Sequence, residues 1–410
     1  QNKYLKYKYK YHSLKKMIGG GIPASYVLTG KNLTLTYKSP SNEQKEIKYN
    51  IKNKIGKGSF GEVYLLQKEG DQTTNYVIKL PVDKSRVINS DSKGDMEKEG
   101  ELSSELLQDV LDDDMLVLFQ GSQQKDFLIS YYNGPNLVEK FILYKRELIE
   151  KYAIVTSQLL DLLSKINKRR IYHNDIKLIN LTFKNDKVYL IDFGSLRRSS
   201  MEGTLFSMSL KSLIVWINKE YPHNIYSASL NLLSESLPDT DSFGFFYACI
   251  DLLGLLIPIK DYSFSKILLF FGINNYSESN SLKLFDLYYF ILPQNLRTNE
   301  IFNQRLETYD RFLPNLEETK KIFVEFDENH NNLFRFMAFI YNLLKNKFNQ
   351  IKLKFFLQTL SDCLLPSFDY DIFIPKFKIA VEQLLPAPVQ PAPVQPAPVQ
   401  PAPVQPAPVQ

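Results

Sequence analysis

The sequence predicts an α+β protein of two lobes: a small, β-rich N-terminal lobe with one helix, and a larger, mostly helical C-terminal lobe. Short runs of alternating or β-branched residues, separated by turn residues, occupy the first third of the chain. From Leu137 onward, apolar residues recur mainly at helical spacing. With 410 residues, 44% of them hydrophobic, the chain can bury the core of a two-lobed molecule with extensions.

The N-terminal lobe is expected over residues 25–133. Leu33, Leu35 and Tyr37 alternate with threonines, as in a strand with one buried face. An acidic helix is expected at about 95–112, because its apolar residues share one face. The strands are expected at 25–37 (one strand or a hairpin), 46–54, 62–66, 76–80, 116–119 and 126–132.

The C-terminal lobe is expected over residues 134–385, after a turn at Asn133-Gly134-Pro135. Its first long helix is expected over residues 148–165. The longest apolar stretch, residues 252–273, is interrupted by Pro258 and by charged residues. We therefore expect a pair of core helices there, and no membrane span.

The two ends of the chain differ from the lobes in composition. Residues 1–24 form a basic, Tyr-rich leader, whose apolar stripe fits a solvated arm, a docking helix or a segment that contacts an anionic surface. Residues 386–410 are five copies of Pro-Ala-Pro-Val-Gln, for which we expect a disordered or polyproline II spacer in preference to a specific ligand. Either end is a candidate for docking a protein partner.

The net charge and the cysteine content limit which classes of protein this chain can belong to. The net charge of +5 is modest, so no nucleic-acid partner is expected. The two cysteines, Cys249 and Cys363, have neither the spacing of a metal site nor the number of a disulfide framework. This indicates a soluble protein of a reducing, intracellular compartment.

A glycine-rich turn joins two predicted strands, with the sequence Ile55-Gly56-Lys57-Gly58-Ser59-Phe60-Gly61-Glu62-Val63. Glycine lacks a Cβ, so backbone N–H groups can close over phosphates. The alternatives are an ordinary turn and a dinucleotide-binding loop, but the latter opens a helix, whereas the residues after Gly61 predict a strand. Lys79 follows in the next apolar run, either as an exposed edge-strand lysine or as a cation for the phosphates.

Polar chemistry is concentrated in Tyr172-His173-Asn174-Asp175-Ile176-Lys177-Leu178-Ile179-Asn180 and in the following Ile191-Asp192-Phe193-Gly194. Phosphoryl transfer from ATP needs a carboxylate to orient the attacking hydroxyl, a cation for the transferred phosphate and oxygen ligands for Mg²⁺. Asp175, Lys177, Asn180 and Asp192 are residues of these types. Taken singly, Asp192 also fits a turn former, Asn180 a helix cap and Lys177 a surface charge.

The segments described above resemble, in the same order, the Gly-rich loop, the strand lysine, the catalytic loop and the DFG turn of protein kinases. The resemblance covers roughly residues 51–255. It implies a bilobal protein-kinase-like fold and a Ser/Thr protein kinase that uses ATP and Mg²⁺ on protein substrates. It also implies that Asp175 accepts the hydroxyl proton and that Lys177 binds the γ-phosphate. Asn180 and Asp192 would hold Mg²⁺.

The same resemblance implies a nucleotide site. Lys79 would bind the α- and β-phosphates and pair with a glutamate of the acidic helix, for which Glu99 fits best and Glu101 next. Ile129 would take the gatekeeper position, and the backbones of Ser130 and Tyr132 would bond adenine. The residues of the loop that would contact the nucleotide are Ile55, Gly56, Lys57, Gly58, Ser59, Phe60, Gly61 and Val63.

Two shorter segments carry finer resemblances. Residues 203–210 are similar to the end of the activation segment in the casein kinase 1 and vaccinia-related kinases, and Asp239 is implied to bond the backbone of the catalytic loop. The leader resembles those of giant nucleocytoplasmic DNA virus proteins, which implies a viral protein located in host cytoplasm or virion.

Asn174 stands where such kinases usually carry an arginine that grips a phosphorylated activation loop. We therefore expect activity that does not require this phosphorylation.

Two other classes of function stay open at this point. A pseudokinase scaffold is opposed by competent residue types at every phosphate- and metal-contacting position. A small-molecule kinase of the aminoglycoside or choline type is opposed by Lys177 and by Phe193-Gly194.

Overall fold

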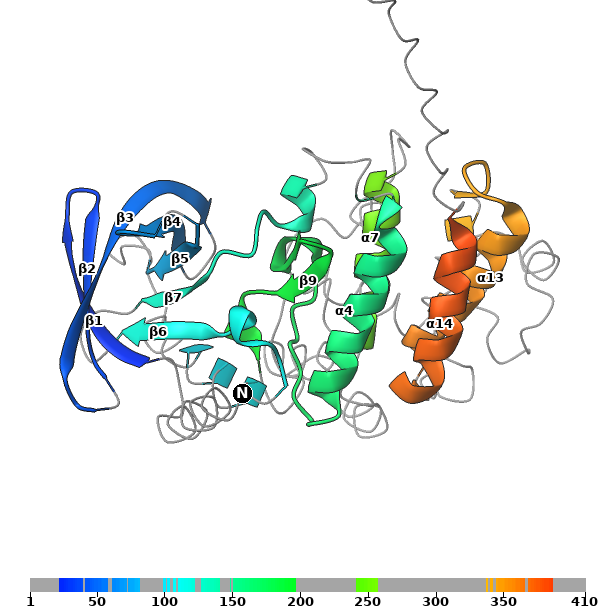
Figure 1. Cartoon of the computed structure of the whole chain (residues 1–410). Coiled ribbons are helices and arrows are strands. Elements are labelled where there is room, and N and C mark those ends of the chain that lie inside the picture. Colours follow the sequence, from blue (N-terminus) through cyan, green and yellow to red (C-terminus); the bar gives the residue numbers. More distant parts are fainter. Residues whose placement is uncertain are drawn as a thin grey trace, which may run out of the picture.

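The computed structural model of the chain has a β-rich part at one side and a helical part at the other (Figure 1). The leader up to residue 21, residues 203–210, Asp239 and the repeat tail lie outside the described residues. The structure describes residues 22–39, 41–57, 61–71, 73–81, 99–100, 102–103, 106–107, 110–121, 127–140, 148, 150–196, 241–256, 337, 340–341, 344–365 and 368–385.

The β-rich part is a closed barrel in the strand order β1-β2-β3-β4-β5-β7-β6. Neighbouring strands are antiparallel except β1 and β6, which are parallel and pair Ile22 with Phe119. The strands are β1 (Ile22–Thr29), β2 (Asn32–Lys38), β3 (Gln44–Lys57), β4 (Glu62–Lys68), β5 (Asn75–Leu80), β6 (Val117–Gly121) and β7 (Leu128–Tyr131).

Of the two alternatives expected for residues 25–37, the structure has the hairpin, in which Gly30 adopts a positive φ of 62° at the turn between β1 and β2. Leu33 and Leu35 are fully buried in the barrel, as their alternation predicts. Closure of the sheet into a barrel was not predicted. It follows from β1, which begins at Ile22, before the expected start of the lobe at residue 25.

The acidic helix is described in part: Glu99, Gly100, Leu102, Ser103, Leu106 and Leu107 are helical. A short 3₁₀ turn, η2 (Asp113–Met115), leads from there into β6. Leu106 and Leu107 are buried in a large apolar cluster that continues into the helical part of the molecule.

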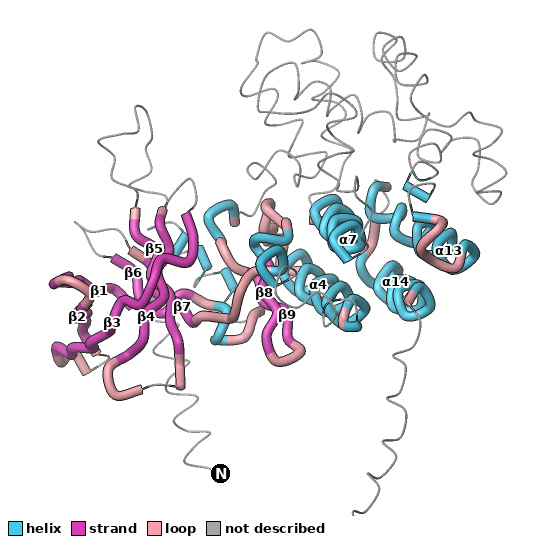
Figure 2. Tube along the Cα trace, turned by 90° about the horizontal axis from the view of Figure 1, so that it is seen from above, coloured by secondary structure: helices cyan, strands magenta, loops and turns pink. Residues whose placement is uncertain are grey.

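The helical part contains the helices α4 (Tyr152–Asn167), α7 (Ser242–Leu256), α13 (Gln350–Ser361) and α14 (Tyr370–Leu384). Figure 2 shows them lying side by side, beyond the barrel. α14 packs on both α13 and α4. Asn349 and Asp369 cap α13 and α14, because each side chain accepts two backbone N–H bonds of the first turn. A 3₁₀ turn, η7 (Asp362–Leu364), follows α13.

The predicted helix at 148–165 corresponds to α4. A two-stranded sheet of β8 (Leu181–Lys184) and β9 (Lys187–Leu190) was not predicted. Its turn residues, Asn185 and Asp186, both have positive φ, the conformation that a two-residue hairpin loop requires. Two further 3₁₀ turns, η3 (Leu178–Asn180) and η4 (Phe193–Ser195), flank this hairpin.

The two-lobed α+β architecture agrees in outline with the sequence prediction. Among the described helices, none is both long and apolar enough to cross a membrane.

Candidate active site

The loop after α4 is held by the N-terminus of α7. Asp241 directly precedes α7, and its carboxylate accepts the backbone N–H of His173 and of Asn174, each at 2.8 Å. The side chain of Asn167, at the end of α4, donates a third bond to Asp241 at 3.3 Å. These bonds fix the loop that carries the predicted Asp175. The positive φ of Asn174, 61°, belongs to the same tight turn.

Asp175 lies next to the two other predicted polar residues of this loop. Lys177 Nζ lies 2.8 Å from Asp175 Oδ2. Asn180 Nδ2 donates to the same Oδ2 at 2.8 Å and to the Asp175 carbonyl at 2.9 Å. Asp175 is nearly buried, so these partners fix the direction of its carboxylate.

The second predicted turn, Asp192-Phe193-Gly194, follows β9. Asp192 adopts the left-handed conformation, with φ 63° and ψ 73°, which is uncommon for a residue with a Cβ and is frequent at functional sites. Phe193 is buried in the large cluster, 5.5 Å from the ring of His173. Asn174 Nδ2 donates to the carbonyl of Ser195 at 3.1 Å, so the two turns are tied together.

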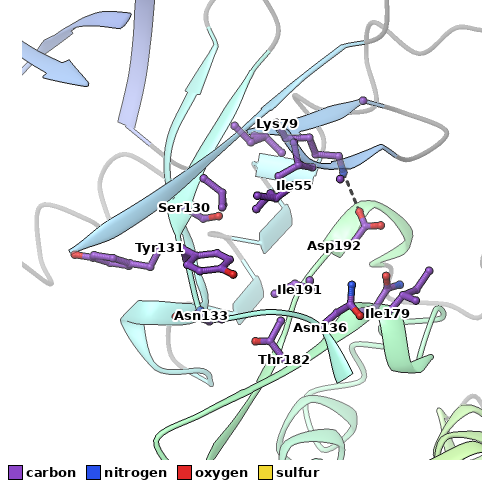
Figure 3. A pocket seen from close by; sticks show the side chains of 18 of the residues that line it. Ile55, Lys79, Ser130, Tyr131, Asn133, Asn136, Ile179, Thr182, Ile191 and Asp192 are labelled. Atoms are coloured by element: carbon purple, nitrogen blue, oxygen red, sulfur yellow. Dashed lines mark hydrogen bonds and ion pairs between the residues drawn. The ribbon is translucent and has the colours of Figure 1, made fainter. Parts of the chain in front are cut away.

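Lys79, on β5, joins the barrel to this turn. Its Nζ lies 2.7 Å from Glu99 Oε2 and 2.8 Å from Asp192 Oδ1. Figure 3 shows Lys79 and Asp192 meeting across the cavity. Burial lowers the pKa of Lys79, but the carboxylates of Glu99 and Asp192 raise it more, so the net shift is upward and the ammonium stays charged. Of the two predicted glutamates, Glu99 makes the pair; Glu101 lies outside the described residues.

A cavity of about 650 Å³ lies between the barrel and the β8–β9 hairpin. Ile55 and Lys79 lie on its barrel side, and Thr182 and Ile191 lie opposite them (Figure 3). A size of this order suits a nucleotide-sized ligand. Other aliphatic or aromatic residues that line it include Val63, Val77, Met115, Val117, Leu128, Ile179 and Phe193.

The glycine-rich turn borders the same cavity. Of the predicted nucleotide contacts, Ile55, Gly56, Lys57, Gly61 and Val63 line it. Gly58, Ser59 and Phe60 lie outside the described residues. The strands on either side, β3 and β4, form the predicted hairpin, with Lys57 paired to Glu62.

On β7 and just after it, the structure corrects the prediction for Ile129 and narrows the prediction for Tyr132. Ile129 does not face the cavity: it is 0% exposed and packs inside the barrel with Ile78, its partner on β5. The neighbouring residues Leu128 and Ser130 face the cavity instead. Tyr132 lines the cavity, but its backbone N–H donates to the Asn75 carbonyl at 3.0 Å and is not available to a ligand.

Two groups near the site were not predicted from the sequence. Asp241 makes the loop contacts that were expected of Asp239, and an aspartate directly before an apolar helix was the signal for this role. Lys187, on β9, lies 2.9 Å from Asp112 and 3.0 Å from Asp114, and Asn133 Nδ2 donates to the Asp114 carbonyl. These contacts fasten the segment before β6 to the β8–β9 hairpin at the edge of the cavity.

Comparison with known proteins agrees with this arrangement. The family model described as the protein kinase domain matches residues 49–214. Serine/threonine-protein kinase KIC1 of Saccharomyces cerevisiae is 27% identical over 190 residues, which are 43% of this chain and 17% of that protein. A probable casein kinase I homolog of Encephalitozoon cuniculi is 27% identical over 181 residues, 40% of this chain and 55% of that protein.

Aurora kinase B of Mus musculus is 28% identical over 167 residues, 38% of this chain and 47% of that protein. The chain thus spans about half, or less, of the length of these curated relatives. Residues 49–214 thus resemble the protein kinase domain, and the proteins they are similar to here are serine/threonine kinases.

Proposed function

We propose that the chain is a Ser/Thr protein kinase that transfers the γ-phosphate of ATP to hydroxyls of protein substrates. The observation that carries the proposal is the meeting of Lys79, Asp192 and Asn180 at one cavity, with Asp175 and Lys177 bonded beside them. Each of these side chains has a task in phosphoryl transfer that its chemistry suits.

The apolar part of the cavity suits the nucleobase. Val63, Val77 and Ile191 offer surfaces on which a flat ring can lie. Backbone N–H groups of successive extended residues point to opposite edges of a strand. Because the Tyr132 N–H points to β5, we infer that the N–H of Asn133, which also lines the cavity, meets the base.

The phosphates would lie along the polar wall. The backbone of the glycine-rich turn and the Lys79 ammonium offer donors and a positive charge for them. Glu99 holds Lys79 in place through their ion pair, and burial of the pair reduces screening by solvent.

The residues also fit Mg²⁺, which prefers oxygen ligands and would neutralise charge on the transferred phosphoryl group. Asp192 offers a carboxylate and Asn180 an amide oxygen, since the Asn180 Nδ2 already donates to Asp175. Asp192 therefore has two tasks, one toward Lys79 and one toward the metal.

Asp175 is the group we assign to the acceptor hydroxyl. The hydroxyl oxygen attacks the γ-phosphorus, the bond from phosphorus to the β,γ-bridging oxygen breaks, and the hydroxyl proton passes to the Asp175 carboxylate. Lys177 pairs with Asp175 before substrate arrives and is placed to balance the charge of the transferred group. The assignment to serine and threonine is supported by Lys177 and by the similar serine/threonine kinases.

We also propose that, among the kinases, the chain is most similar to the casein kinase 1 type. Residues 203–210, which resemble the casein kinase 1 type, lie outside the described residues, and a casein kinase I homolog is among the similar proteins. The leader and the repeat tail are assigned to partner contact or addressing, and the lobes to residues 25–133 and 134–385.

The test is transfer of labelled phosphate from ATP with Mg²⁺ to generic protein acceptors. Asp192→Asn is expected to abolish transfer, because the metal loses its charged ligand. Asp175→Asn is expected to reduce the rate by about 10² to 10⁴, the usual contribution of a positioned base. Thr73→Ala, in the turn before β5 and away from the cavity, serves as the control and should match the parent. If both aspartate variants match the parent, the assignment is wrong.

A further inference from the structure

The position of Glu99 depends on how closely its helical stretch approaches the sheet. Glu99 is 6% exposed, and its Oε2 lies 2.7 Å from Lys79 Nζ. The next residue along the chain is Gly100, which is also buried. Ser103, one turn later, is fully buried and donates its hydroxyl to the Gly100 carbonyl at 3.3 Å.

Gly100 lies against two side chains of the sheet. A Cβ placed on Gly100 would lie 2.3 Å from Gln120 Oε1, 3.0 Å from Leu128 Cδ2 and 3.3 Å from Gln120 Cβ. A Cβ on Gly100 would require the end of the Gln120 side chain to turn away, and the contacts at 3.0 and 3.3 Å would also require Leu128, Gln120 or the helical stretch to shift. The absence of a side chain at Gly100 is therefore what allows the present approach.

The register of the sheet connects this contact to Lys79. Lys79 on β5 pairs with Leu128 on β7, and Leu128 pairs with Gln120 on β6. The three residues thus form one row across adjacent strands, which lie about 4.8 Å apart. Glu99 lies over the Lys79 end of the row and Gly100 over the Leu128 and Gln120 end. A shift of the stretch at Gly100 consequently moves Glu99 relative to Lys79.

We propose that Gly100 provides a seat, the space against Gln120 and Leu128 that it leaves free of side-chain atoms, and that this seat lets Glu99 reach Lys79 for their ion pair. The inference rests on the proposed function, because its effect is read through the phosphate-binding lysine. Gly100 is a positioning residue and touches no reacting atom. Within the described part of the chain, Gln120 Oε1 is buried and has no hydrogen-bond partner, so shortening Gln120 makes room at the seat and removes no bond of this oxygen.

The test is a set of variants in the full chain, measured by kcat/KM for labelled phosphate transfer and by thermal midpoint. Gly100→Ala is expected to reduce kcat/KM at least tenfold, about 1.4 kcal/mol. Alanine is the better helix former, so propensity alone predicts a raised midpoint and unchanged transfer. Gln120→Ala, which widens the seat, is expected to stay within threefold of the parent. The double variant Gly100→Ala/Gln120→Ala should return to within threefold of the parent.

Two further measurements separate positioning from a general structural effect. In a Glu99→Gln background, Gly100→Ala should cost less than twofold, because the interaction through which it acts is already weakened. Ser103→Ala, on the same buried face one turn away, is the matched control and should not reproduce the tenfold loss.

The outcomes are distinct. If the parent is active and Gly100→Ala is equally active, the proposal that Gly100 provides the seat for Glu99 is wrong. If the parent itself is inactive, the proposed function is wrong. A Gly100→Ala loss that persists in the double variant, or that adds fully to Glu99→Gln, also overturns the seat. If Gly100→Ala does not fold, restored folding and transfer in the double variant support the seat, and a double variant that stays unfolded contradicts it.

Discussion

Replacing Asp241 with Asn is expected to lower the free energy of unfolding by about 3–7 kcal/mol. The Asp241 carboxylate is 3% exposed and accepts the N–H groups of His173 and Asn174, one on each oxygen, at 2.8 Å. An asparagine keeps a single oxygen, so its amide group would point one donor at another donor. The two loop amides are backbone groups and cannot leave this position without moving the loop.

The magnitude follows from the bonds that change. A hydrogen bond to a charged group contributes about 1.5–3 kcal/mol, and a buried donor left without a partner costs about 1–3 kcal/mol. The carboxylate also lies at the N-terminus of α7, where a negative charge contributes about 0.3–1 kcal/mol. The remaining amide bond becomes neutral and weaker. These contributions together give the expected loss, a large part of the usual stability of about 5–15 kcal/mol.

The assay is urea unfolding followed by circular dichroism, with Asp239→Asn as the matched control. Both loop amides already bond Asp241, so the control should change stability by less than about 0.5 kcal/mol. Equal losses in the two variants, or a larger loss in Asp239→Asn, would refute the reasoning.

Three more predictions concern the ends of the chain, regulation and the thiols. A chain of residues 22–385 should keep the thermal midpoint and the ATP turnover of the full chain, since β1 begins at Ile22; insolubility or inactivity would show that the leader packs on the lobes. Phosphatase treatment and the Ser199→Ala/Ser200→Ala variant should leave initial rates within about tenfold of the parent, because Asn174 is a neutral amide bonded to the Ser195 carbonyl. Burial raises the pKa of Cys249 and Cys363, so iodoacetamide should label them only after unfolding, and rapid labelling of the folded protein at pH 8 would contradict their burial.

The contacts predicted best from the sequence are those between residues that lie close together along the chain. Asp175, Lys177 and Asn180 lie within one loop, and their contacts follow from local turns. Glu99 was preferred over Glu101 from its place above Leu102 and Leu106, and the structure pairs it with Lys79. Helical periodicity likewise located α4 to within a few residues.

What could not be predicted depends on partners far apart in the chain. Alternation in β2 shows which side chains share a face but not that the neighbouring β1 pairs with β6, so closure of the barrel was missed. One face of β7 points into the core of the barrel, and its other face lines the cavity. The apolar run therefore did not indicate which residues face the cavity. The gatekeeper position was assigned to Ile129, whereas the next residue, Ser130, is the one that faces the cavity.

The most direct test of the central claim is the chemical identity of the acceptor. Parent protein and Asp175→Asn are incubated with γ-labelled ATP and Mg²⁺, once with mixed protein acceptors and once with aminoglycoside and choline acceptors. The account predicts label on serine and threonine of the proteins, absent or at least a hundredfold lower with Asp175→Asn, in line with the loss of about 10² to 10⁴ expected of a positioned base. Label on the small molecules alone, or no transfer by the parent to any acceptor, would contradict it.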